Sequence, residues 1–521
     1  MMPVPGVFRE RWSLVLPLLL CAAVLVLWPA TVVLAALLRA GEGEPVAISA
    51  GLVARSVAWA LMIGVIATFI AWPAAFALRD RRWSVWVLLP MAMPSYLVFH
   101  ALGLLRDPAG PLGAWIERRV DAGWTDLATL INQFIAVVGL AAWVWPLCAV
   151  VVGARLREVP AHVDESLRLD GAGFLRRQWQ QFVMAAGAAA GAVGLAAVVM
   201  LGSAVPLHLA QAPTLSVAAW LAATLHPGDP GVWKTGVPAI IGAIAAAAVI
   251  ARRGPGQDEA ALGRPAPRAS RVYAGLLLAL GVVVPAFAYA TAVRNWQSAL
   301  QFAAVILPAF GASIAIASAV GGLCAVVMLC AWRAERAAGG AAPTAGVVAL
   351  GFLIIAALTP GILVGQAWLM AGMALGPWFA GGPFPVVLAH AARFAGIAAL
   401  AGVAMARLEP RDVRFMRLLD AGHGPGAWLR LAVAPRAWAV PGVAAATFCL
   451  SLHEVEATII LQPPGVTSLS QTMLAQLHFA RNDEIAAGSL LVLAATTPAM
   501  LLAGWGFARV AESETRGVGR A

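Results

Sequence analysis

Residues 127–154 read LATLINQFIAVVGLAAWVWPLCAVVVGA, a run of 28 residues without a charge. A helix of about 20 apolar residues crosses the hydrocarbon core of a bilayer. Over the 521 residues of the chain, 61% are hydrophobic and the mean hydropathy is +0.84. With 35 basic and 25 acidic residues, charge is too sparse for a soluble globular protein. The sequence therefore predicts an all-α polytopic membrane protein.

Eleven further apolar runs surround this one. In the first half, spans are expected at 13–38, 56–78, 83–105, 127–154, 182–205 and 235–251. In the second half, they are expected at 272–293, 303–332, 345–370, 384–406, 433–452 and 485–508. The first run follows two arginines, as in a signal peptide, but it is too long and lacks a small-residue cleavage site, so we expect a retained helix. The prediction is about 12 transmembrane helices.

The basic residues predict the orientation, because cytoplasmic loops carry the excess of Arg and Lys. With the N-terminus inside, the cytoplasmic segments hold 26 basic residues and the outer loops hold eight. Both termini are therefore expected in the cytoplasm, at a bacterial inner membrane. The net charge of +10 then reflects topology and does not indicate nucleic-acid binding.

The sequence gives little support for a nucleotide-binding or redox function of this chain. The only lysine, Lys234, follows a tryptophan, so the chain has no P-loop. ATP and Mg²⁺ are therefore expected on a partner, and no cofactor on this chain. The five cysteines lie inside apolar runs without a Cys-x-x-Cys pair, which predicts small buried hydrophobes.

The stretch RRGPGQDEAALGRPAPRASR, residues 252–271, divides the chain into near-equal parts. It is rich in Gly, Pro and charge, which predicts a cytoplasmic linker. Residues 1–251 and residues 272–521 would each form a six-helix half. Because six is even, both halves have the same orientation, which predicts parallel repeats related by an axis along the membrane normal.

Two long cytoplasmic loops occupy the same place in the two halves, before the penultimate span. The first contains VPAHVDESLRLDGAGFLRRQW, residues 159–179, and the second contains RDVRFMRLLDAGHGPGAWLRLAVAPRAW, residues 411–438. In each, a charged amphipathic segment runs into a turn with Asp and Gly, and a second helical segment returns to the membrane. Gly171 and Gly422 mark the two turns.

These loops resemble those of the permease subunits of binding-protein-dependent ABC importers. That motif reads Glu-Ala-Ala, three residues, Gly, nine residues, then Ile-x-Leu-Pro. Glu165 and Gly171 fit its opening in the first copy, where Met184 replaces the proline. Gly422 and Pro435 fit its second part, where the sequence Met-Arg-Leu replaces Glu-Ala-Ala.

Two other segments are similar to the fused iron(III)-type permeases. They are VLLPMAMPSYLVFHALGLLRDPAGPLGAW, residues 87–115, and SLHEVEATIILQPPGVTSLSQTML, residues 451–474, which ends in a Ser-Leu-Ser step that the first half repeats as Thr-Leu-Ser at 214–216. The resemblance implies the type I ABC importer permease fold, an extracytoplasmic solute-binding protein and two copies of a cytoplasmic ATPase. Ferric iron is the first cargo that it implies, with thiamine, polyamine or another small solute as alternatives.

The resemblance also implies that the two loops dock on the ATPase subunits and transmit their motion. The expected coupling residues are Glu165, Arg168, Asp170 and Gly171 in the first loop and Arg417, Asp420, Gly422 and Pro435 in the second. For one loop alone, an amphipathic helix on lipid headgroups is the alternative.

Arg393 and His390 are candidates for a translocation path. Arg393 precedes Arg407 by 14 residues, about 21 Å along a helix, and an ionisable group at that depth usually faces the bundle interior. His390 lies one turn away, and the pair could line a path for an anionic or chelated cargo. The alternative is a structural arginine bonded to helix-end carbonyls.

His453, Glu454 and Glu456 follow the eleventh run and are weak candidates for metal ligands, because hard oxygen ligands suit ferric iron. A solvated membrane boundary has the same composition, and no metal site is assigned.

Two other classes of function compete with an importer. A secondary transporter usually needs carboxylates within its spans, and the predicted spans contain neither Asp nor Glu. A membrane-embedded enzyme would draw on residues 106–126, which carry Asp107, Glu117, Asp121 and Asp126.

Overall fold

The computed structural model describes residues 5–39, 48–108, 110–159, 161–252, 267–335, 341–409, 416, 419 and 424–518. All regular elements in these residues are helices. Within them, nine helices are long and apolar enough to cross a membrane, and the number reaches twelve if each of three bent pairs is one span. These segments coincide with the twelve apolar runs, and the predicted all-α polytopic membrane protein is confirmed.

The first half consists of α1 (Pro5–Ala22), η1 (Ala23–Leu27), α2 (Trp28–Arg39), α3 (Ala50–Ala75), η2 (Ala77–Arg79), α4 (Arg81–Val87), η3 (Leu89–Ala92), α5 (Ser95–Gly103), η4 (Leu104–Arg106), α6 (Pro111–Asp121), α7 (Leu127–Glu158), α8 (Ala161–Leu169), α9 (Phe174–Leu201), α10 (Val205–Leu209), α11 (Leu215–Leu225) and α12 (Val232–Arg252).

The second half consists of α13 (Arg268–Leu278), η5 (Ala279–Val283), α14 (Val284–Ala292), α15 (Trp296–Ala334), α16 (Ala341–Leu358), α17 (Gly361–Leu375), α18 (Pro377–Ala380), α19 (Phe384–Leu408), α21 (Pro425–Trp428), η6 (Leu429–Val433), η7 (Ala434–Arg436), α22 (Ala439–Leu452), α23 (Glu456–Leu461), α24 (Leu469–His478) and α25 (Asn482–Val518). Because α13 begins at Arg268, it includes the last four residues of the predicted linker, and residues 253–266 lie outside the described residues.

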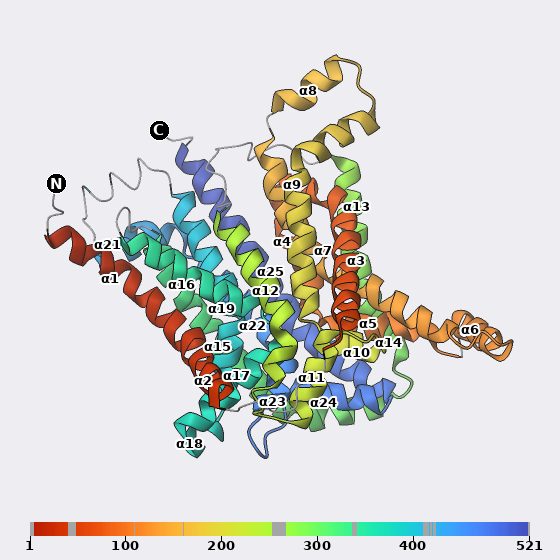
Figure 1. The fold of residues 1–521 in the computed structure, drawn as a ribbon. Helices are drawn as coiled ribbons and strands as arrows, with labels where there is room; N and C mark the ends of the chain where they lie inside the picture. The colour runs from red at the N-terminus through yellow and green to blue at the C-terminus, as the bar shows by residue number, and fades with distance from the viewer. Residues whose placement is uncertain are drawn as a thin grey trace.

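Short helices lie at both ends of the bundle of long helices. The helix α8 lies at the end where the two chain termini are drawn, and α11, α18, α23 and α24 lie at the opposite end (Figure 1). Between the ends, large apolar side chains point outward, among them Phe69, which is 80% exposed, Phe134, Phe287 and Val305. An apolar surface of this kind is stable in contact with lipid chains and unstable in water.

Small residues let the central helices of each half approach closely. In the first half, α3 packs against α7 and α9, and in the second half α15 packs against α19 and α22. A Cβ atom added at Gly64 in α3 would lie 2.7 Å from the Val193 carbonyl oxygen in α9. At Gly321 in α15, the same addition would lie 2.7 Å from the Ala444 carbonyl oxygen in α22. Glycine is therefore required at both contacts, as is common where membrane helices touch.

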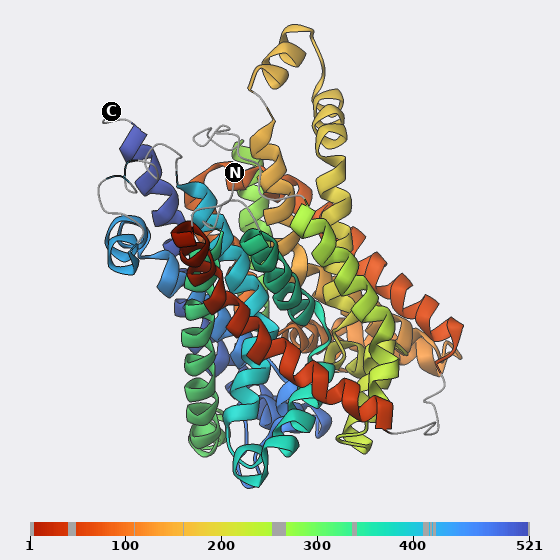
Figure 2. The same cartoon turned by 60° about the vertical axis from the view of Figure 1, so that its left-hand side comes forward.

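The first helix of each half packs against the other half. Val15 and Leu18 of α1 share a hydrophobic cluster with Leu353 of α16, and α1 also contacts α15. In return, α13 contacts α3 and α4, and Ala274 of α13 joins the core of the first half. Figures 1 and 2 show α1 along the second-half helices and α13 beside α3.

Both exchanged helices contain a π-helical turn at the same place. The turns are η1 and η5, and Pro29 and Pro285 each occupy the second residue of the following helix. Proline has no amide hydrogen and its ring clashes with the carbonyl four residues earlier, so a widened turn relieves the clash.

Three predicted spans are broken, which the apolar pattern alone did not reveal. The third bends by 71° between η3 and α5, and the ninth bends by 112° between α16 and α17. Pro94 and Pro360 are the residues immediately before α5 and α17, with extended ψ angles of 142° and 136°. Proline is compatible with the start of a helix but not with its interior, so each one begins a new helix in a new direction.

The third break is a difference between the two halves. The eleventh span bends by 71° between η7 and α22, whereas the equivalent helix of the first half, α9, is continuous. Pro435 lies in η7, two residues before the bend. The first half has Met184 at the corresponding motif position. The bend therefore accompanies the half that carries the proline.

The exchanged packing generates a cross-linking prediction. The thiols of Cys21 in α1 and Cys330 in α15 adjoin each other. If a protease site is inserted within residues 253–266, mild oxidation should hold the cleaved halves in one band on non-reducing gels, and a reductant should separate them. The variant Cys330→Ala is the control and should give separate halves throughout. Separate halves after oxidation of the parent protein would contradict the packing of α1 on α15.

Candidate functional site

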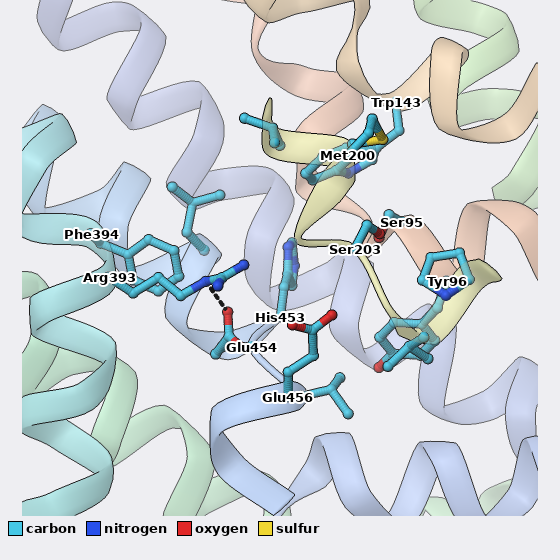
Figure 3. Close-up of a pocket in the computed structure, with 15 residues that line it drawn as sticks. Ser95, Tyr96, Trp143, Met200, Ser203, Arg393, Phe394, His453, Glu454 and Glu456 are labelled. Atoms are coloured by element: carbon cyan, nitrogen blue, oxygen red, sulfur yellow. Dashed lines mark ion pairs between the residues drawn. The ribbon is translucent and has the colours of Figure 1, made fainter. Parts of the chain in front are cut away.

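A cavity of about 120 Å³ lies where the two halves meet. Its walls include three aromatic side chains, Tyr96, Trp143 and Phe394, and a polar group composed of Arg393, His453, Glu454 and Glu456 (Figure 3). Aromatic residues from α5 and α7 of the first half thus face charged residues from α19 and the α22–α23 junction of the second. This is the meeting point of segments that are hundreds of residues apart in sequence.

Two helix breaks line the cavity, one from each half. In the first half α9 ends at Leu201 and α10 begins at Val205, and in the second half α22 ends at Leu452 and α23 begins at Glu456. Each break leaves backbone groups without intrahelical partners, and these need other partners in a buried site.

Serines of the Thr-Leu-Ser and Ser-Leu-Ser sequences provide hydrogen-bond partners for some of these backbone groups. The Ser216 hydroxyl donates to the Ser203 carbonyl at 3.1 Å, and the Ser470 hydroxyl donates to the Leu452 carbonyl at 3.3 Å. A motif that was noted only for its resemblance therefore satisfies the backbone at both breaks.

Arg393 joins three elements at the side of the cavity. Its Nε lies 2.8 Å from Oε2 of Glu454, and its Nη1 donates to the Thr359 carbonyl at 2.9 Å, where the ninth span breaks. Glu454 is 7% exposed and Arg393 19%. Gly361, the first residue of α17, leaves room for this pair, since a Cβ there would collide with Oε1 of Glu454 and Nη1 of Arg393. Arg393 thus lines the cavity and also satisfies a helix-end carbonyl.

Glu456 crosses from the second half to the first. Its Oε1 accepts a hydrogen bond from the Ala204 amide at 2.7 Å, at the break between α9 and α10. Its Oε2 is buried without a hydrogen-bond partner, and the carboxyl group lies beside the Ile362 amide at the start of α17. Neither ring nitrogen of His453 has a partner of good hydrogen-bond geometry.

His390 is not among the cavity-lining residues. It is 2% exposed, with Nδ1 2.8 Å from the Ser451 hydroxyl and Nε2 3.0 Å from the Thr458 hydroxyl. The Thr458 hydroxyl donates to the Glu454 carbonyl, so it accepts from Nε2 of His390, which leaves Nδ1 to accept from Ser451. With these two hydrogen bonds the ring holds α22 and α23 together behind the cavity. The structure therefore separates the roles of His390 and Arg393.

The first predicted coupling loop contains a short exposed helix, α8, followed by a glycine turn. Glu165, Arg168 and Asp170 are exposed. Gly171 has a φ of +71°, its amide donates to the Arg168 carbonyl, and the Ala172 amide donates to the Leu167 carbonyl. This bonding pattern is a Schellman motif, which ends a helix with a residue in the left-handed region. Glycine is the residue that adopts this φ without strain.

In the second predicted coupling loop, Arg417, Asp420 and Gly422 lie outside the described residues. Pro435 is exposed in η7, next to the bend of the eleventh span.

The structure gives no support to the hypothesis of a metal site at the end of the eleventh span. Within the described ranges, no group of three or more His, Cys, Asp or Glu side chains is arranged to hold a metal ion. His453, Glu454 and Glu456 are therefore left without a metal assignment. The structure instead pairs Glu454 with Arg393, a residue some 60 positions earlier in the chain.

Comparisons of the chain with models of protein families, with curated proteins and with solved structures found no match. The cavity is therefore interpreted from its own geometry.

The buried ion pair generates a stability prediction. Arg393→Gln leaves the Glu454 carboxylate buried without its cation, and we expect a loss of about 3 kcal/mol in unfolding free energy. The double variant Arg393→Gln/Glu454→Gln should lose clearly less than the sum of the two single variants, because no charge is then left alone. Thermal or denaturant unfolding in detergent would measure all three. Additive losses would show that the pair is not coupled.

Proposed function

We propose that this chain is the transmembrane permease subunit of an ABC importer, driven by ATP hydrolysis on a separate ATPase subunit. A solute-binding protein on the outer face would deliver the cargo. The observation that carries the proposal is α8, an amphipathic helix that stands clear of the bundle at the end where the chain termini lie (Figures 1 and 2).

The surface of α8 suits a protein partner. Leu169 is 88% exposed at its end, between the exposed charges of Arg168 and Asp170. A large apolar side chain flanked by charges is typical of an anchor in a protein interface, where the apolar group enters a pocket and the charges fix orientation. The Schellman turn at Gly171 separates α8 from α9, so a partner that moves α8 would act on a helix that reaches the cavity.

The two ends of α9 support a transport mechanism. Its beginning follows α8 by a short turn, and its end lies at the break beside the cavity. In an importer, two ATPase subunits would close on ATP, push both loops and switch the bundle between two packings, which would open the cavity to alternate sides. The positive-inside charge distribution would place α8 and both chain termini in the cytoplasm.

The resemblance names ferric iron as the first cargo, with thiamine, polyamine or another small solute as alternatives. The position of the cavity between the halves supports a small solute as cargo, without deciding among these. The linker and the similar helix breaks support two parallel six-helix halves in one chain, so one permease would serve two ATPase subunits.

Glu456 favours a second candidate, a proton-coupled secondary transporter. The spans lack carboxylates, but Glu456 lies outside them and is nonetheless buried beside the cavity. A buried carboxyl group without a full set of partners is what a proton carrier requires. Uptake into liposomes driven by a proton gradient, without ATP, would identify this mechanism.

A membrane-embedded enzyme gains less support. Asp107, its first candidate carboxylate, forms an ion pair with Arg294 at 3.1 Å. Glu117, Asp121 and Asp126 are exposed on and after α6, which projects from the side of the bundle (Figure 1).

The coupling role of α8 can be tested with two glycines of the same conformation. Gly171 and Gly123 both have positive φ, +71° and +97°, and nothing lies within 4 Å of an added Cβ at either. Proline fixes φ near −65°, so Gly171→Pro should disrupt the turn after α8. We expect it to abolish copurification of the ATPase and ATP-driven uptake, while membrane insertion persists.

Gly123→Pro is the matched control, because it makes the same backbone change in the turn before α7, at the other end of that helix from α8. It should retain the ATPase. Undiminished ATPase association and uptake in Gly171→Pro would refute the coupling role, and failure of any ATPase to associate with the folded parent chain would refute the importer.

A further inference from the structure

The charges that line the cavity do not balance. Arg393, Glu454 and Glu456 are its lining residues with formal charge, and Arg393 is committed to Glu454 by the 2.8 Å contact. Glu456 therefore remains as a second carboxyl group that lies in the field of Arg393 but forms no ion pair with it. The cavity as a whole is more favourable for a cation than for an anion.

Glu456 is also incompletely bonded. It is 7% exposed, one oxygen accepts from the Ala204 amide, and the other oxygen is buried in the cavity wall without a partner of good hydrogen-bond geometry (Figure 3). The amide of Ile362 at the start of α17 lies beside this carboxyl group and adds the partial positive charge of a helix N-terminus. A buried polar atom without a partner carries a desolvation cost, which a ligand that donates a hydrogen bond would remove.

The rest of the wall favours a nitrogen cation. The guanidinium of Arg393 already occupies one carboxylate, which shows that this site accommodates N–H donors in charge-assisted hydrogen bonds. The aromatic side chains Tyr96, Trp143 and Phe394 complete the wall, and aromatic rings attract organic cations. A metal ion would need several ligand side chains around it, and no group of three or more His, Cys, Asp or Glu residues within the described ranges is arranged to hold one.

We infer that the cavity binds a small organic ammonium ion, with Glu456 as its counter-charge and hydrogen-bond acceptor. The inference gives a cargo class to the proposed transporter and rests on that function for its biological role. Binding itself depends only on this chain. Among the solutes implied by the resemblance, it favours amines over ferric iron.

The test uses the full chain, purified in lipid nanodiscs without any ATPase, and radiolabelled 1,4-diaminobutane as the probe. The parent protein should bind the probe saturably, and excess ferric citrate should not displace it. Glu456→Gln keeps a carbonyl oxygen to accept from the Ala204 amide but removes the charge. It should weaken binding about tenfold or more, since a charge-assisted hydrogen bond is lost.

Two controls separate a binding effect from misfolding. Glu117→Gln makes the same chemical change on exposed α6 and should bind like the parent. Glu456→Asp keeps the charge on a shorter side chain and should retain more binding than Glu456→Gln, with all variants matched for thermal stability. Absent binding by a stable parent, equal binding by Glu456→Gln, or displacement by ferric citrate would overturn the inference.

The outcomes also separate this inference from the proposed function. If an ATPase copurifies but 1,4-diaminobutane does not bind, the cation site fails and the importer stands. If the probe binds and depends on Glu456 but no ATPase associates, the site stands and the importer fails.

Discussion

The lack of hydrogen-bond partners in a bilayer is the constraint on which this structure depends. A continuous helix satisfies its own backbone, but each broken helix exposes amides and carbonyls that lipid cannot satisfy. At every break beside the cavity a side chain takes that role: Trp143 donates to the Met93 carbonyl, Arg393 to the Thr359 carbonyl, and Glu456 accepts from the Ala204 amide. The polar groups of the cavity are thus also the groups that make the breaks possible.

Composition and apolar run length were sufficient to predict the membrane class and the positions of all twelve segments, because span length is set by bilayer thickness. The breaks were not predicted, although Pro94 and Pro360 were visible, since proline occurs in continuous membrane helices as well. Pro146, inside the unbroken α7, is an example. Whether a proline breaks a helix depends on the neighbours that can satisfy the freed backbone.

The site was predicted only in pieces. The position of Arg393 deep in its span predicted that its side chain faces the bundle interior. The alternative was a structural arginine bonded to a helix-end carbonyl. In the structure Arg393 does both, because it lines the cavity and donates to the Thr359 carbonyl. The pairing of Arg393 with Glu454 could not be read from the sequence, because it depends on how α19 meets the end of α22. The burial of Glu456 follows from the turn after Leu452, which directs a nominal loop back into the bundle. Trp143 carried no signal beyond its apolar run.

Similar parts do not make the halves equivalent. Gly64 and Gly321, the two π-helical turns and the two serine-bonded breaks recur in both, yet the charged residues of the cavity all come from the second half. The first half contributes aromatic, aliphatic and serine residues to it. The backbone features of the two halves are therefore similar, but the side chains that line the cavity differ between them. Such a difference suits a site in which one solute occupies a single position between two similar halves.

The exchange of α1 and α13 has a consequence for biosynthesis. The helix α1 is translated long before α15 and α16, the helices against which it packs. Until α15 and α16 have been made, α1 lacks the helices that cover it in the folded protein. Because α1 and α13 each complete a core of the other half, we expect the last packing steps to follow synthesis of the second half.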